Sequence, residues 1–169
     1  MKMEFKDGYF DGEVDDKGNF TGKIVYNNGD VYDGKMIDGV FEGKVTVHYE
    51  YGVYSGEWSK GDKNGTGTMT WSDGEVYVGE FQDGVMHGKG QFTWVNGDSY
   101  TGDWVGGKMH GIGKLTWGNK LEYYDGEWSD GERNGRGIYR NPNGNLFEET
   151  FLKGERQTSI RINNDKKDA

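Results

Sequence analysis

A repeat of about 23 residues constrains what this chain can fold into more than any other feature of its sequence. In most copies a tyrosine stands shortly before a glycine and an aromatic or other apolar residue follows two positions after it, as in YSGEW (Tyr54 to Trp58). The successive spacings of the anchoring residues are 22, 22, 23, 23, 24 and 23 residues. A fixed period over nearly the whole chain is typical of repeat architectures, so one small structural unit should recur along it. The anchoring residues are Gly12, Gly34, Gly56, Gly79, Gly102, Gly126 and, in the last copy, Glu149.

Further glycines recur at fixed places inside the copies. In four copies, a glycine five residues after the anchor is followed by NGTG, HGKG, HGIG or NGRG. The segments SDGE, VNGD and NPNGN close three of the copies. Asn-Gly and Asp-Gly between alternating runs are the strongest short-range signal of a β-hairpin. Each copy is therefore predicted to form two strands.

The residues of each copy alternate in character with a period of two. In the third copy, Tyr54 and Trp58 share one parity, whereas Ser55 and Glu57 take the other. In the following run, the glycines, Met69 and Trp71 share a parity, and threonines oppose them. Period-two alternation predicts strands with one face of rings and glycines and one face of polar residues.

The composition leaves no ordinary aliphatic core. Hydrophobic residues make up 32% of the 169 residues, yet aromatic residues reach 15% and glycine occurs 31 times. Rings that lie over glycine positions can bury their area against the backbone of a neighbouring strand. Because one hairpin cannot bury its ring face alone, the copies should stack on each other.

Charge and cysteine content exclude some classes of function. The net charge is -9 and no window holds a run of Lys and Arg, which argues against binding of a nucleic-acid backbone. The absence of cysteine excludes disulfides and thiolate metal sites. The segment MKMEFKDGYFDGEV has no apolar run typical of a signal peptide, and no stretch approaches the roughly 20 apolar residues of a membrane helix, so we expect a cytoplasmic protein.

The repeated residues resemble the MORN repeat, whose pattern is close to Y-x-G-x-W-x-x-G-x-x-H-G-x-G. YVGEFQDGVMHGKG (Tyr77 to Gly90) and YTGDWVGGKMHGIG (Tyr100 to Gly113) match it nearly throughout. The resemblance implies an all-β fold, an elongated and twisted single-layer antiparallel sheet of tandem β-hairpins. We expect one domain over residues 1–157 and a polar C-terminal tail over residues 158–169. About seven repeats should begin near Tyr9, Tyr32, Tyr54, Tyr77, Tyr100, Tyr124 and Phe147.

The copies near both ends depart from the pattern. The first has Val14 in place of tryptophan, and the second has Met36 there and Val45 where the second glycine of a pair belongs. The last has Glu149 for the anchoring glycine. Atypical terminal copies are expected, because an end repeat has a neighbour on one side only. Within the tail, Ser159 to Ile162 are candidates to cover the edge of the sheet.

Two histidines are candidate metal ligands. His87 and His110 hold the same place in adjacent copies, but residues one hairpin apart lie about 10 Å from each other. Two ligands of one zinc ion must lie within about 4 Å of each other. We therefore predict no metal site, a turn-stabilising role for both histidines, and an exposed position for His48.

No motif indicates catalysis or a bound cofactor. GTG, GKG and GIGK resemble phosphate-binding loops, which require a helix N-terminus that the sequence does not predict. The acidic residues are spread singly, without a pair that suggests a general acid and base. We predict neither an enzyme nor a cofactor.

The aromatic face is the candidate functional surface. A single-layer sheet leaves its rings uncovered on one side, and exposed aromatic area of several hundred Å² marks an interaction site. Anchoring glycines that we expect to be structural are Gly34, Gly56, Gly79, Gly102 and Gly126. The candidate partner-binding residues are Trp58, Trp71, Tyr77, Phe81, Trp94, Tyr100, Trp104, Trp117 and Trp128.

The favoured function is a non-catalytic scaffold that binds a peptide or an amphipathic helix of a partner protein on this face. Proteins of the MORN family are similar in acting as scaffolds, and the end repeats are candidates for a homodimer contact. Membrane or phosphoinositide binding, also proposed for the family, is an alternative that the acidic charge disfavours. Carbohydrate stacking on the rings is a third possibility.

Overall fold

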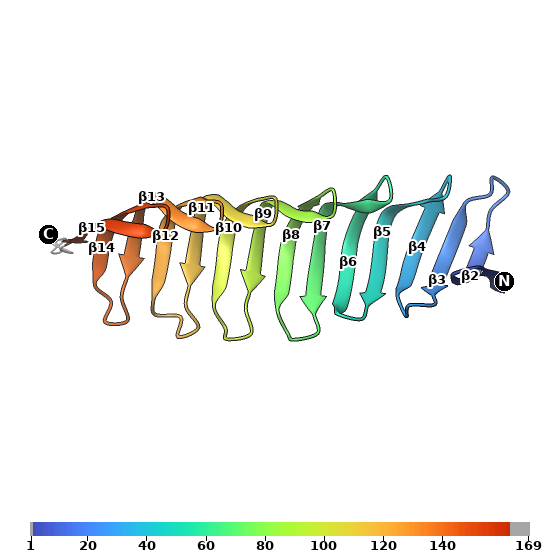
Figure 1. Ribbon diagram of the computed structural model, residues 1–169, viewed down its shortest axis with the longest axis horizontal. Helices are drawn as coiled ribbons and strands as arrows, with labels where there is room; N and C mark the ends of the chain where they lie inside the picture. The colour runs from blue at the N-terminus through green and yellow to red at the C-terminus, as the bar shows by residue number, and fades with distance from the viewer. Residues whose placement is uncertain (1, 163–169) are drawn as a thin grey trace, which may run out of the picture. The chain divides into compact units, whose positions relative to one another are not determined.

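The structure is a computed structural model that describes residues 2–162, and in that range it contains strands and turns but no helix (Figure 1). The strands are β1 (Lys2–Phe5), β2 (Gly8–Val14), β3 (Phe20–Tyr26), β4 (Val31–Ile37), β5 (Val40–Tyr49), β6 (Gly52–Ser59), β7 (Asp62–Trp71), β8 (Val76–Gln82), β9 (Val85–Thr93), β10 (Ser99–Val105), β11 (Lys108–Thr116), β12 (Tyr123–Ser129), β13 (Glu132–Arg140), β14 (Leu146–Leu152) and β15 (Glu155–Ile162).

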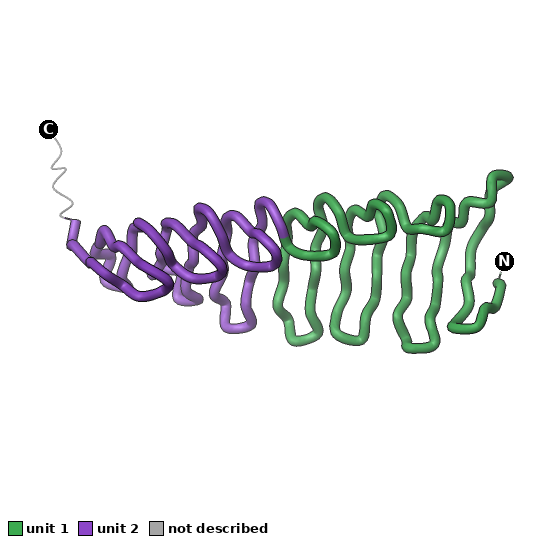
Figure 2. Tube along the Cα trace, turned by 45° about the horizontal axis from the view of Figure 1, so that its top comes forward, with its two compact units in different colours: residues 1–86 green, residues 87–169 purple. Residues whose placement is uncertain are grey.

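The chain divides into two compact units, residues 1–86 and residues 87–169, here called unit 1 and unit 2 (Figure 2). In unit 1, each strand from β1 to β8 pairs antiparallel with the next strand along the chain. In unit 2, the strands from β9 to β15 pair in the same way. The predicted all-β fold of antiparallel hairpins is confirmed, whereas a single domain over residues 1–157 stays a prediction.

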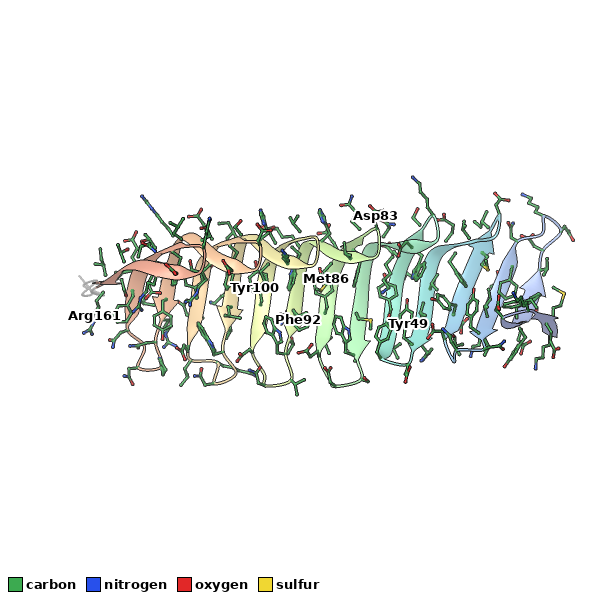
Figure 3. All side chains as sticks on the ribbon, viewed as in Figure 1. Tyr49, Asp83, Met86, Phe92, Tyr100 and Arg161 are labelled. Atoms are coloured by element: carbon green, nitrogen blue, oxygen red, sulfur yellow. The ribbon has the colours of Figure 1, made fainter. Side chains whose placement is uncertain are left out.

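Tight two-residue turns form the tips of the hairpins. Between β6 and β7, φ is +56° at Lys60 and +83° at Gly61. Positive φ at both central residues defines a type I′ turn, whose twist matches that of the flanking strands. Asp83 lies at such a tip, at the top of the view in Figure 3. From the second copy onward, the glycine five residues after the anchor therefore supplies the second residue of the turn.

A bulge interrupts the hairpins between the tip and the anchoring glycine. The pairing of β6 with β7 changes from Gly56 opposite Gly67 to Trp58 opposite Lys63, so β7 carries extra residues at this point. A bulge bends a strand and increases its twist. In Figure 1 the hairpins curl over at their tip ends. Register shifts at the equivalent place occur between β4 and β5, β10 and β11, β12 and β13, and β14 and β15.

An acidic side chain holds the extra residues of the bulge. Gly65 has a φ of +94°, and the backbone N–H of Thr66 donates to Oε2 of Glu57 at 2.6 Å. The Thr66 hydroxyl also donates to Oε2, and the two hydrogen bonds hold the pKa of the Glu57 carboxyl below its usual range. In unit 2, Asp103 accepts in the same way from Ile112 at 2.9 Å and Glu127 from Arg136 at 2.8 Å.

Some hairpins after β5 have a glycine on the second strand opposite the anchoring glycine, and they are here called complete hairpins. In each of them the ring of the anchoring tyrosine is buried. Tyr54 is 0% exposed, and a Cβ built on Gly67 would lie 2.5 Å from its hydroxyl oxygen. The hydroxyl donates to the carbonyl of Glu57 at 3.0 Å. The ring therefore lies directly on the two facing glycines, Gly56 and Gly67, and the space that it fills is here called the ring slot. The other tyrosines with no exposed area are Tyr77, Tyr100 and Tyr124.

The buried rings connect one hairpin to the next. The Tyr54 ring lies 6.2 Å from Trp58 in its own hairpin and 5.1 Å from Phe81 of β8, both edge-on. In unit 2 the ring of Tyr100 (Figure 3) lies 5.2 Å from Trp104 and 5.3 Å from Trp128. Each hairpin thus supplies part of its neighbour's core, as the composition predicts.

The second hairpin fills its ring slot differently. Val45 stands opposite Gly34 and is 2% exposed, so its side chain occupies the space that a tyrosine ring takes elsewhere. The Tyr32 ring is only half-buried and stacks on Phe41 with a centroid distance of 5.3 Å. One valine in place of a glycine therefore moves the anchoring tyrosine out of the slot.

The first hairpin differs by one residue from the sequence interpretation. Phe10, not Tyr9, stands two positions before Gly12, and its ring packs on the buried Phe20 at 4.4 Å. Tyr9 takes the other parity and lies beneath the ammonium group of Lys2 at 3.9 Å. The pairing of β2 with β3 shows no register shift, so this hairpin lacks the bulge.

The last strand, β15, is an exposed edge strand. It pairs with β14, and all eight of its residues are exposed. It includes Ser159 to Ile162, the segment considered as an edge cover, so the predicted tail begins inside a strand. The rest of that tail, residues 163–169, lies outside the described residues.

Candidate functional site

A groove of about 410 Å³ lies in unit 2 and is lined by residues from both ends of its hairpins. Trp94 and Trp117 directly follow the second strands of two successive copies, and Asp98 belongs to the turn between β9 and β10. Met109 and Arg133, each two residues after a tip glycine, line it from the other side. The bulge brings these positions to one groove, because it folds the tips over the strands.

The groove combines aromatic surface with two carboxylates, those of Asp98 and Glu132. Oδ1 of Asp98 accepts from the N–H of Gly118 at 2.7 Å, and Oδ2 accepts from the side chain of Asn96 at 2.9 Å. Neither Asp98 nor Glu132 makes an ion pair within residues 2–162. The Arg133 guanidinium lies over the Phe151 ring at 4.2 Å.

A second cavity of about 250 Å³ shares Trp117 and Arg133 with the groove. Its carboxylate Glu149 is 1% exposed, and Nη1 of Arg156 lies 3.0 Å from Oε1 of Glu149. The hydroxyl of Tyr139 donates to Glu122, and burial together with this bond raises the pKa of Tyr139 to about 12. The two cavities together hold four carboxylates, Asp98, Glu122, Glu132 and Glu149, and two guanidinium groups.

The indole N–H groups of unit 2 fall into two classes. Nε1 of the buried Trp104 donates to the carbonyl of Gly90 at 3.2 Å, and Nε1 of the buried Trp128 donates to that of Gly113 at 2.9 Å. The half-buried Trp94 and Trp117 make no hydrogen bond through Nε1 within the part of the chain that the structure describes. The two groove tryptophans therefore present unused donors.

Unit 1 carries a different chemistry at the equivalent positions. Lys63 stands where Met109 and Arg133 stand in unit 2, and its ammonium lies 5.1 Å from the Tyr49 ring centroid and 5.3 Å from that of Tyr54. Burial lowers the pKa of this lysine. Trp71 ends β7 and is half-buried. At this position unit 1 therefore has a lysine ammonium group beside two tyrosine rings, where unit 2 has Met109 and Arg133.

The polar face of unit 1 has a broad hollow of about 810 Å³. Glycines and small side chains such as Thr46, Ser55 and Thr68 line it, and the Thr46 and Ser55 hydroxyl oxygens lie 3.2 Å apart. Its lining includes no aromatic side chain, whereas binding sites are typically lined by hydrophobic and aromatic side chains, as the groove of unit 2 is.

The nine aromatic residues predicted to bind a partner divide by burial. Trp58, Tyr77, Phe81, Tyr100, Trp104 and Trp128 are 7% exposed or less, because the curled hairpins cover them. Trp71, Trp94 and Trp117 are half-buried, and the last two line the groove together with the buried Trp128. No observation tests partner binding by these nine, which stays a prediction. Each of the five anchoring glycines faces another glycine or Val45 on the neighbouring strand, where the two backbones come close together.

The sequence did not predict several of the residues that line the groove. Asp98, Met109 and Arg133 meet the tryptophans only because the hairpin bends, and no alternation rule signals that bend. The acid after the anchor, as in Glu57 and Asp103, accepts hydrogen bonds at the bulge, but it does not predict the bulge, since Lys35 holds that place in the bulged hairpin of β4 and β5.

The described residues contain no cluster of three or more His, Asp or Glu side chains that could hold a metal ion. Residues 2–162 also contain no helix long and apolar enough to cross a membrane. His87 and His110 lie in β9 and β11, and the carbonyl of His110 accepts a hydrogen bond from Tyr100 at 3.2 Å.

Comparison with known protein families identifies the repeat. The model of the MORN repeat matches residues 54–76, 77–99, 100–121 and 124–146, which together make up more than half of the chain. The chain belongs to the MORN-repeat family. The four matched MORN repeats include both groove tryptophans, and the family model does not confirm the expected number of about seven.

MORN repeats are generally non-catalytic modules that interact with proteins or membranes. No curated protein sequence matches this MORN-repeat chain. Among solved structures, one that matches is the TCP domain of SAS-4 (dCPAP) from Drosophila melanogaster in complex with a proline-rich motif of Ana2 (dSTIL). It is 14% identical with a TM-score of 0.46, and the match covers 91% of this chain and 90% of that one. A likeness this weak bears on neither the fold nor the partner of this MORN-repeat protein.

Proposed function

We propose that this protein is a non-catalytic interaction module that binds a segment of a partner protein in the groove of unit 2. The observation that carries the proposal is the groove itself. It combines the half-buried rings of Trp94 and Trp117 with apolar side chains and a few polar groups. Binding sites are typically concave and mostly apolar, with a small number of placed polar groups that fix orientation.

A protein partner fits the groove better than a membrane does. The two cavities hold four carboxylates against two guanidinium groups, and the whole chain has a net charge of -9. Anionic headgroups attract clusters of lysine and arginine and are repelled by such a surface. Cytoplasmic localisation and a homodimer contact through terminal repeats stay predictions from the sequence.

A displayed library of random peptides tests the proposal. Peptides selected on the full chain should lose binding to a Trp94→Ala, Trp117→Ala double variant, because tryptophans commonly carry much of the binding energy at an interface. Ile112→Ala is the matched control, since Ile112 is 57% exposed in the same unit and does not line the groove. Circular dichroism must show that the double variant keeps its strands. Selected peptides that bind the folded double variant as well as the unchanged chain would refute the proposal.

A further inference from the structure

Resting on the proposed function, we propose that the groove of unit 2 takes a basic, proline-rich segment of another protein in the polyproline II conformation. Three independent features of the groove agree on this occupant: the spacing of its rings, its unused hydrogen-bond donors, and its charge.

The spacing of the two groove tryptophans matches a polyproline II helix. Trp94 and Trp117 hold equivalent places in successive copies, one hairpin apart. Two strands across a sheet span about 9.6 Å. Three residues of polyproline II span about 9.3 Å and complete one turn. Residues i and i+3 of such a segment therefore lie over the two rings, whereas an extended strand places same-face residues about 6.7 Å apart.

The unused indole donors suit a backbone that makes no hydrogen bonds of its own. A polyproline II segment leaves its carbonyl groups without internal partners. Trp94 and Trp117 are half-buried, and their Nε1 donors find no acceptor among residues 2–162. An α-helix has already satisfied its carbonyls internally, so only its last turn would have acceptors to offer.

The carboxylates that line the groove favour a positively charged segment. Asp98 and Glu132 line it without an ion pair among the described residues. Arg133, the one guanidinium shared by both cavities, already lies against the rings of Phe151 and Tyr124. Complementary charges at an interface speed association and reject partners of like charge. Lysine or arginine on the side of the segment that faces these carboxylates meets this requirement.

The test uses the full chain and three synthetic peptides, followed by tryptophan fluorescence at low salt. Ac-PPKPPKPPK-NH2 carries two rows of proline and one of lysine. One control replaces every lysine with glutamine, and another replaces every proline with alanine. We expect saturable binding of the first peptide and at least about tenfold weaker binding of both controls, since each loses a set of favourable contacts.

Two conservative variants assign the binding to the groove. Trp94→Phe keeps a ring and removes the indole donor, and should weaken binding of the lysine peptide by roughly 3- to 10-fold. Asp98→Asn keeps an acceptor for Gly118 and removes the charge, and should reduce the salt dependence of binding. Ile112→Ala should change neither quantity.

The outcomes separate this inference from the function on which it rests. Equal binding of the alanine and proline peptides, or no effect of Trp94→Phe, overturns the polyproline II occupant. Library peptides that bind the groove without prolines or basic residues overturn it as well, while the interaction module stands. Binding of phosphatidylserine vesicles that the lysine peptide does not compete with would overturn the inference and assign the surface to a membrane.

Discussion

Two neighbouring hairpins of unit 1 bury their anchoring tyrosines differently. In the hairpin of β6 and β7, Gly67 leaves room for the ring of Tyr54, which is 0% exposed. In the hairpin of β4 and β5, Val45 fills the equivalent space and Tyr32 is half-buried outside it. A single side chain on the facing strand therefore decides whether the anchoring tyrosine belongs to the core or to the surface.

The same substitution affects a tryptophan of the next hairpin. Trp104 and Trp128 donate through Nε1 to the carbonyl of a glycine opposite their own anchoring glycine. The equivalent acceptor for Trp58 is the carbonyl of Val45, and the buried Nε1 of Trp58 has no partner within residues 2–162. The glycine pair thus serves two rings at once, the tyrosine that lies on it and the tryptophan that bonds its backbone.

The largest effect is expected when the complete hairpin is converted to the other type. Gly67→Val places a side chain where the ring of Tyr54 lies, since even a Cβ would come 2.5 Å from the hydroxyl oxygen. Expelling a buried ring should lower the free energy of unfolding by about 3–5 kcal/mol. Urea denaturation measures the loss. Thr68→Val, on the opposite face of the same strand, should change stability by less than about 0.5 kcal/mol.

The reverse substitution, Val45→Gly, should empty the slot of the second hairpin. Loss of the buried side chain should destabilise the protein by about 2–4 kcal/mol, reduced if Tyr32 moves in. Nitration of Tyr32, followed by mass spectrometry, should slow in this variant. Val53→Gly, on the polar face, is the control that should leave the nitration rate of Tyr32 unchanged. An unchanged rate in Val45→Gly would show that the valine does not hold Tyr32 out.

Alkaline titration should show the contribution of the slot tyrosines to stability. Burial raises the pKa of Tyr54 and of Tyr124 to about 12, above the ordinary value of 10.0. A raised pKa of a neutral acid means that its stabilising contribution is complete below pH 10 and is lost as the pH rises toward 12. The free energy of unfolding should therefore fall over this range. Gly67→Val should show a shallower fall, because Tyr54 leaves its slot.

The smallest effect concerns one hydroxyl in two equally buried rings. Tyr54 donates to the carbonyl of Glu57 at 3.0 Å, whereas the buried hydroxyl of Tyr124 has no partner among the described residues. Tyr54→Phe should cost about 1 kcal/mol, and Tyr124→Phe should be close to neutral. Equal losses in thermal or urea unfolding would contradict the assignment of the hydrogen bond.

The strands and their turns were predictable because their signals are local. Alternation placed Tyr54, Trp58 and Met69 on one face, and these are the residues that the structure buries. The glycines five residues after the anchors marked the type I′ turns, since positive φ restricts the residues that fit there.

The bend was not predictable, because the acid after the anchor does not determine it alone. Glu13 holds that place in the first copy, yet the pairing of β2 with β3 has no register shift. Conversely, Lys35 and Thr150 hold that place in the hairpins of β4 with β5 and of β14 with β15, and the pairing of both hairpins shifts in register. Without the bend, the sequence interpretation left six rings exposed that the curled hairpins cover, and it missed Asp98 and Arg133 as neighbours of the tryptophans.

The ring contacts between successive hairpins have a consequence for how such a chain changes over evolutionary time. The Tyr54 ring packs on Trp58 of its own hairpin and on Phe81 of the next hairpin. A deletion or duplication that begins and ends at equivalent positions of two copies keeps both kinds of contact at the new junction. Duplication or deletion of a whole 23-residue segment therefore leaves each new junction packed like the old ones. A one-residue insertion inside a strand reverses the faces of all residues up to the next turn. Natural variation in length among related genes should accordingly come in whole copies.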